Sequence, residues 1–183
     1  MFHFLSISNL NTSKGTFVLL DAAELLLKQT TDFHIHFVGA STAEISAERM
    51  QREIEGRGLQ DVVTYHGKQY GKDKEARLAE ADCFVHPTLD DCFPLVILEA
   101  MQHSLPVIAT PVGAIPDMVI DGETGMLVPP SDTKVLSGAM LHVVLNTAWA
   151  CDAGENGCKT VLQQFSKAFF ENSMISILET ARY

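Results

Sequence analysis

Short apolar runs alternate with amphipathic stretches along most of the chain. Runs bounded by turn residues are typical of buried strands, and the longer stretches between them have the periodicity of helices. The pattern predicts strands at residues 2–8, 33–38, 62–65, 83–86, 106–109 and 126–128. It predicts helices at residues 14–28, 43–56, 72–80, 94–103 and 132–146, then at 152–164 and 167–179, with no strand after the last two.

This alternation predicts a Rossmann-like, doubly wound α/β fold with a six-stranded, mostly parallel sheet. No repeat, low-complexity segment or Ser/Gly-rich linker divides the chain, so we expect one domain over residues 1–183. Its α/β core would cover residues 2–148, and extra helices would cover residues 149–183. Such sheets bind ligands beyond the carboxyl ends of their strands, so the loops after the strands are the candidate sites.

Composition and charge exclude several classes of protein. The 183 residues are 46% hydrophobic, and 13 Lys+Arg against 23 Asp+Glu give a formal net charge of −10, which disfavours binding to nucleic acid. The apolar runs are far shorter than the roughly 20 residues that span a bilayer. The four cysteines form no CxxC pair, so we expect no structural disulfide and a reducing, cytoplasmic location.

The first candidate segment follows the first predicted strand and contains Lys14. Thr12 or Ser13 is expected to cap the next helix, which would put Lys14 in its first turn. A cation there is disfavoured by about 0.3–1 kcal/mol, and an anion bound in front of it would explain the lysine. The alternative is a solvated surface lysine beside a turn glycine.

The second candidate segment is residues 91–101. Pro94 suits a first helical turn, and Glu99 is the one charge on an otherwise apolar helix, which predicts a buried carboxylate in need of hydrogen-bond donors. Hydroxyls of a sugar or ribose would serve.

Asp91 lies eight positions before Glu99, which places the two carboxylates on the order of 10 Å apart. A retaining hydrolase needs about 5–5.5 Å. The spacing instead fits two ends of an extended ligand whose diphosphate rests on the helix amides. The alternative makes Asp91 a simple helix cap and Glu99 the partner of a core histidine or lysine.

Together these segments resemble the donor-binding half of the family 4 (group 1) retaining glycosyltransferases of GT-B fold. The resemblance covers roughly residues 2–180. It lies in an E-x7-E-like motif, a G-G-x-P-E-like turn and a D-G-x-x-G-x-L-V strand, preceded by K-G, V-G and A-D-x-x-V-x-P-S-like elements in the family's order. The corresponding residues are 91–101, 113–117, 121–129, 13–15, 37–39 and 81–88.

The resemblance implies three catalytic residues. Lys14 would neutralise the donor diphosphate, Glu99 would hold the ribose hydroxyls, and Asp91 would contact the transferred sugar. The other donor-binding positions that it implies are Asn9, Gly15, Gly39, Gly67, Lys68 and the amides of Phe93, Leu95 and Val96.

Several positions depart from the family pattern. Asn9 stands where the family has an arginine on the diphosphate, and Asp91 is one methylene shorter than glutamate. Ala114 and Asp117 replace Gly and Glu in the turn, and Ser104 stands where a helix-ending glycine is common. These departures keep open an alternative function, a non-catalytic nucleotide-binding or interaction module derived from the same domain.

As a transferase, the protein would move a hexosyl group from a UDP-, GDP- or ADP-sugar to a glycan or lipid-linked acceptor, as in polysaccharide biosynthesis, with no cofactor and no metal. The acceptor site would lie on an N-terminal GT-B domain that this chain lacks, so the chain alone is not expected to turn over. In the full-length enzyme, attachment to the cytoplasmic face of a membrane stays open.

Three other features have simpler interpretations. His34 and His36 share a strand face but lack an evident third metal ligand. His86 ends a strand at the ligand edge and could line the site. The apolar stripe that begins at Phe165 is typical of core or partner contact and suggests self-association through the C-terminal helices.

Overall fold

A six-stranded parallel sheet forms the centre of the molecule. The computed structural model describes residues 1–180. In chain order the strands are β1 (Phe2–Ile7), β2 (Phe33–Val38), β3 (Val63–Tyr65), β4 (Cys83–His86), β5 (Val107–Ala109) and β6 (Gly125–Leu127). Their spatial order is β3-β2-β1-β4-β5-β6, with every pair parallel. The predicted doubly wound fold is confirmed, and strand order reverses between β1 and β4.

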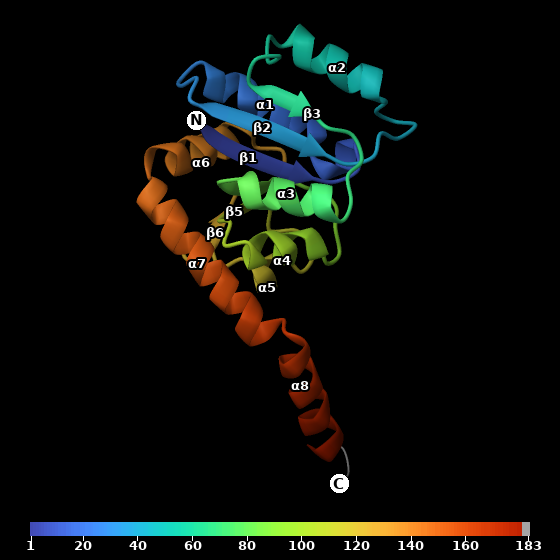
Figure 1. The fold of residues 1–183 in the computed structure, drawn as a ribbon, viewed down its shortest axis with the longest axis vertical. Coiled ribbons are helices and arrows are strands. Elements are labelled where there is room, and N and C mark those ends of the chain that lie inside the picture. Colours follow the sequence, from blue (N-terminus) through green and yellow to red (C-terminus); the bar gives the residue numbers. More distant parts are fainter. Residues whose placement is uncertain (181–183) are drawn as a thin grey trace.

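Helices cover both faces of this sheet (Figure 1). After β1 comes a short 3-10 helix, η1 (Thr12–Lys14). The α-helices are α1 (Thr16–Leu27), α2 (Ala47–Gly56), α3 (Lys72–Glu80), α4 (Leu95–Gln102), α5 (Ile115–Met118), α6 (Thr133–Leu145), α7 (Thr147–Gln164) and α8 (Lys167–Thr180). The last three residues of the expected C-terminal helical segment lie outside the described part.

Two apolar cores follow from this layering. One core joins β1 and β2 to α1, α2 and α6, with Phe4, Leu20 and Met140 fully buried. The other joins β4 and β5 to α3, α4 and α7, with Phe84 and Ile97 at its centre. The sheet is therefore buried on both faces near the switch point, which holds the loops after β1 and β4 on a rigid base.

The start of α1 differs from the prediction. Lys14 ends η1 instead of opening α1, and neither Thr12 nor Ser13 caps that helix. The cap position belongs to Gly15, at φ 72°, where a Cβ would lie 2.0 Å from the carbonyl oxygen of Pro87. Close packing of the β1 loop on the β4 loop imposes this left-handed residue, and such a residue breaks the helix.

The other helices match in position with shifted ends. The helix expected at residues 43–56 begins at Ala47, behind a Ser46 cap that accepts from the Arg49 amide. The helix expected from residue 152 begins at Thr147, and the four-residue α5 was not predicted. We expected α4 to be buried on every side, but Leu95 in its first turn is 64% exposed.

The C-terminal helices leave the body of the domain. α7 packs along α4, where Gly154 meets the backbone of Ser104 and Gly157 meets Met101. α8 then projects away from the sheet (Figure 1). Its apolar side chains are exposed, as the predicted stripe requires for a partner contact; they include Phe170, Met174, Ile175 and Leu178.

Candidate functional site

The carboxyl ends of β1, β2 and β4 bring the candidate residues together in two clusters. One cluster lies where the β1 loop meets the loop between β4 and α4. The other lies in a hollow between the ends of β1 and β2 and the helices α3 and α4. Both border the point where strand order reverses, which is the ligand position expected for this fold.

Lys14 and Asp91 form the first cluster. Lys14 Nζ donates to Asp91 Oδ2 at 2.9 Å and to the carbonyl oxygen of Asp90 at 2.8 Å. His86 Nε2 lies 3.3 Å from the same Asp91 oxygen. An ammonium has three hydrogens, so one donor of Lys14 remains for a ligand.

Electrostatics fix the protonation states in this cluster. Burial alone would raise the pKa of Asp91, but the hydrogen bond and charge of Lys14, with those of His86, lower it below the ordinary value. Burial lowers the pKa of His86 by more than Asp91 raises it. His86 is therefore neutral at pH 7 and donates through Nε2, while its buried Nδ1 has no partner among the described residues.

Backbone contacts set the position of this cluster. The Leu89 amide donates to the Ser13 carbonyl at 2.7 Å, and the Ala114 amide donates to the Cys92 carbonyl at 2.9 Å. Gly113, at φ 56°, approaches so closely that a Cβ would lie 2.1 Å from the Asp91 carbonyl oxygen. Three segments far apart in the sequence thus hold Asp91 in place.

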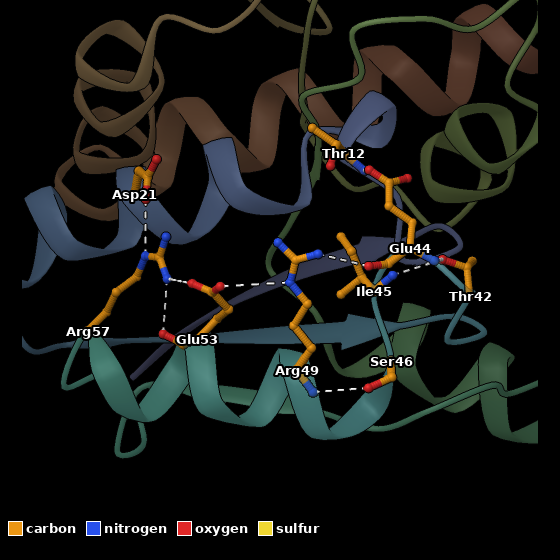
Figure 2. A network of polar contacts seen from close by, with 9 residues as sticks. All are labelled: Thr12, Asp21, Thr42, Glu44, Ile45, Ser46, Arg49, Glu53 and Arg57. Atoms are coloured by element: carbon orange, nitrogen blue, oxygen red, sulfur yellow. Dashed lines mark hydrogen bonds and ion pairs between the residues drawn. The ribbon is translucent and has the colours of Figure 1, made fainter.

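A polar network holds the β1 loop from its other side (Figure 2). Thr42 Oγ1 donates to the Leu10 carbonyl at 2.7 Å, and the Thr12 amide donates to Glu44 Oε1 at 3.3 Å. Arg49 donates to the Glu44 carbonyl at 2.9 Å. Farther along α2, Arg57 pairs with Glu53 and with Asp21 of α1. The β1 loop is therefore anchored to the segment before α2, which Arg49 ties to that helix, as well as to the β4 loop.

Glu99 belongs to the second cluster and is paired with Lys74 of α3. Lys74 Nζ donates to Glu99 Oε1 at 2.6 Å. The lysine is the kind of partner proposed above as the alternative to ligand hydroxyls. However, the Glu99 side chain is 38% exposed, so its carboxylate is not sealed in the core as expected.

Both members of this pair line a hollow of about 150 Å³. Other residues that line it are Ser8, Asn9, Gly39, Lys68, Gln69, Tyr70 and Val96. A Cβ on Gly39 would lie 1.8 Å from the Ser8 carbonyl oxygen, so this glycine allows the close approach of two strand ends. Gly67 lies behind it and accepts from the Gly39 amide at 2.9 Å. The ammonium of Lys68 sits 4.7 Å from the centre of the Tyr70 ring.

Phe93 and Leu95 lie elsewhere. Their side chains line an apolar hollow of about 390 Å³ between the start of α4 and the junction of α7 and α8. Only backbone amides of these residues were predicted to serve the donor. The expected site residues are therefore distributed over three neighbouring places, and Asp91 and Glu99 share no partner.

Sequence reasoning missed Lys74 entirely. It sits in the first turn of α3, a segment for which the sequence pattern predicts a helix and no site residue. The one local signal was a cation at a helix start, the same signal that drew attention to Lys14. His86 was noticed as a residue of the ligand edge, and the structure places it against Asp91.

His34 and His36 belong to a row of imidazoles across β1, β2 and the end of β3. His36 lies 3.0 Å from a ring nitrogen of His3 and 2.9 Å from one of His66, and His34 contacts Thr64. In residues 1–180, no group of three or more His, Cys, Asp or Glu side chains is placed to hold a metal ion. The four cysteines are free thiols, and none of the described helices is both long and apolar enough to cross a membrane.

Comparison with known proteins assigns the family. Residues 2–146 match the family model of the group 1 glycosyl transferases. The chain is 26% identical over 188 residues to a putative colanic acid biosynthesis glycosyltransferase, WcaL, of Salmonella typhimurium, covering 96% of this chain and 44% of that protein. It is 34% identical over 135 residues to the D-inositol 3-phosphate glycosyltransferase of Paenarthrobacter aurescens, covering 72% and 33%.

A solved structure agrees with the fold. Anabaena HepE in complex with UDP superposes with a TM-score of 0.87 at 22% identity, covering 98% of this chain and 49% of that one. The chain thus spans less than half of each of these three proteins. Because the family match extends over most of the described sheet and its loops, the chain belongs to the group 1 glycosyltransferases.

Proposed function

We propose that this chain is the donor-binding half of a retaining glycosyltransferase that transfers a hexosyl group from a nucleoside-diphosphate sugar. The observation that carries the proposal is that two separate lysine–carboxylate ion pairs lie near the switch point of the sheet. A diphosphate would bind at Lys14 and the amides at the start of α4, and the ribose would bind in the hollow beside Glu99.

The roles of the residues follow from their chemistry. Lys14 keeps one free donor for the leaving diphosphate, whose growing negative charge it would stabilise in the transition state. Asp91, held ionised, would accept from hydroxyls of the transferred sugar. Asn9 stands at the same edge as a neutral donor to phosphate.

The acceptor and the rest of the catalytic site belong to a second domain in this proposal. That domain would carry the glycan or lipid-linked acceptor. The structure of HepE was solved with UDP, which makes a uridine nucleotide the first ligand to test. The family match favours a transferase over a non-catalytic module.

Calorimetry on the 183-residue chain tests this proposal. UDP, GDP, ADP and their hexose conjugates are titrated into the wild type, into Lys14→Ala and into Glu99→Ala. We expect one nucleotide to bind the wild type and each variant to weaken it at least about tenfold, the value of a charge-assisted hydrogen bond. No binding across the panel would overturn the proposal.

A further inference from the structure

Lys74 and Glu99 form one of two polar side-chain contacts that join α3 to α4 and to His103, the residue directly after α4. The second joins Glu75 Oε2 to His103 Nε2 at 3.1 Å, one residue farther along α3. The two contacts differ in their surroundings. Lys74 and Glu99 both line the hollow at the ends of β1 and β2, whereas neither Glu75 nor His103 does. The Lys74 side chain is 20% exposed, and that of Glu75 is 57% exposed.

The position of Lys74 is costly for the helix that carries it. Lys74 lies in the first turn of α3, where the positive end of the helix dipole disfavours a cation. Asp73 and Glu75 are the residues that suit this turn. Glu99, at 2.6 Å, supplies Lys74 with an anion from outside the helix, whereas Lys72 in the same turn has no such partner among the described residues.

The pair leaves the carboxylate competent for a ligand. Lys74 binds only Oε1 of Glu99, and an ionised carboxylate offers about four acceptor sites over its two oxygens. Among the described residues, no other hydrogen bond is made to this carboxylate, and Glu99 lines the hollow. Two adjacent hydroxyls of a ribose can use these sites as donors.

Lys74 also changes the charge that a nucleotide would meet. The protein carries a net charge of −10, and a nucleoside diphosphate is itself an anion. An unpaired Glu99 would repel that ligand, whereas the pair with Lys74 is neutral and holds the carboxylate in one orientation.

We propose that Lys74 is a positioning residue for the ribose: it orients and neutralises Glu99 so that this carboxylate selects a nucleotide with both ribose hydroxyls. This inference rests on the proposed function and deepens it, since it states how the donor site recognises the sugar of the nucleotide. Lys74 acts through Glu99 and does not itself need to touch the ligand.

The test compares two ligands across matched variants. UDP and 2′,3′-dideoxyuridine diphosphate, and likewise GDP and its dideoxy form, are titrated into the wild type, Lys74→Met, Lys74→Arg and Glu75→Gln. Glu75→Gln is the matched control because it alters the contact of α3 with His103, directly after α4 and outside the hollow. Thermal unfolding of each variant is measured in parallel.

We expect the wild type to prefer the ribonucleotide by about tenfold or more, as for a buried hydrogen bond to a charged group. Lys74→Met should reduce that preference to about twofold, because it should weaken the binding of the ribonucleotide and leave the binding of the dideoxy ligand unchanged. Lys74→Arg should restore most of it, and Glu75→Gln should leave it unchanged.

Three outcomes would overturn the inference. Equal weakening of both ligands by Lys74→Met would make the pair a purely structural contact, and tighter binding of the ribonucleotide would make Lys74 an obstacle. Either result leaves the proposed function standing, because the wild type still binds a nucleotide. Failure of the wild type to bind UDP, GDP or ADP would remove both proposals.

Discussion

The two lysine–carboxylate pairs differ in how the fold holds them. Lys14 ends the short helix η1 and Asp91 lies in the loop before α4, and their carboxylate is fixed by a second partner, His86, and by close backbone contacts from Gly15 and Gly113. Lys74 and Glu99 sit on helices, and their pair lines a hollow at the strand ends. The first pair depends on close packing among several loop segments, and the second depends on how α3 packs against α4.

The difference suggests a division of labour. A cluster held from several sides keeps its geometry when charge develops on a leaving group, which favours a role in the reaction. A pair facing an open hollow can admit and release a nucleotide. Disturbing each pair separately should therefore affect different quantities, stability in the first case and ligand selectivity in the second.

Gly15→Ala should break the first cluster with the largest effect. The added Cβ would meet the Pro87 carbonyl at 2.0 Å, and Gly15 already has a left-handed φ of 72°. We expect the free energy of unfolding, measured in urea, to fall by about 3–5 kcal/mol. Gly58→Ala is the control, since its φ of 67° is similar but its Cβ would meet open space, and about 1 kcal/mol is expected there. Equal losses would show that Gly15 matters only for its backbone angle.

Acid should weaken the fold through the histidines whose pKa is lowered, which include His86 beside Asp91 and His36 of the imidazole row. Burial, then the neighbouring charges of His34, His66, His3 and Arg77, lowers the pKa of His36 from 6.5 to about 4. Between these values the unfolded chain binds a proton that the folded chain does not, so stability falls as the pH falls. Allowing for partial exposure, we expect a loss of about 1–2 kcal/mol between pH 7 and pH 5.

Asp91 should not contribute to that loss. Its pKa is lowered below 3.8, so the stability that it provides is present above this pH and is lost only in stronger acid. Urea unfolding of two variants at pH 7 and pH 5 checks this assignment. His36→Gln should reduce the loss of unfolding free energy between these pH values, and Asp91→Asn should not reduce it. If His36→Gln loses as much stability between pH 7 and pH 5 as the wild type, the pH dependence of stability comes from other groups.

Asp91→Asn should also show how strongly Lys14 binds a diphosphate. Removal of the carboxylate charge frees the ammonium for a diphosphate and removes repulsion of that anion. We expect UDP to bind about three- to tenfold more tightly, while UMP gains less because it carries one phosphate. Weaker UDP binding would mean that Asp91 is needed to orient Lys14. Calorimetry with both nucleotides measures the difference.

Most of the fold was predictable because its strands are buried runs. The six predicted strands are present, and only their ends shift, since buried apolar runs with turn residues on both sides allow few other structures. The start of α1 was wrong because the left-handed Gly15 is set by Pro87, a contact that local propensity does not contain. α5 was missed because four residues are too few to show a period.

The sequence singled out several residues that the structure brings together, but it did not show how they pair. Lys14 stood out as a cation at an expected helix start and Asp91 by its spacing from Glu99, yet their contact joins residues 77 positions apart. Lys74 and Glu99 are 25 positions apart on different helices. Partners of this kind depend on helix packing, and a single sequence carries no local trace of it.

The smallest expected effect comes from the network that anchors the β1 loop to α2. Glu44→Ala removes an exposed acceptor 3.3 Å from the Thr12 amide, whereas the bond from Thr42 to Leu10, at 2.7 Å, remains. We expect a loss of about 0.5 kcal/mol in urea unfolding and UDP affinity within about twofold of the wild type. Lys14 should keep its place because the β4 loop holds it through Asp90 and Asp91. A larger loss of UDP binding would show that the first cluster depends on α2 as much as on the β4 loop. Both lysine–carboxylate pairs would then depend on the position of a helix.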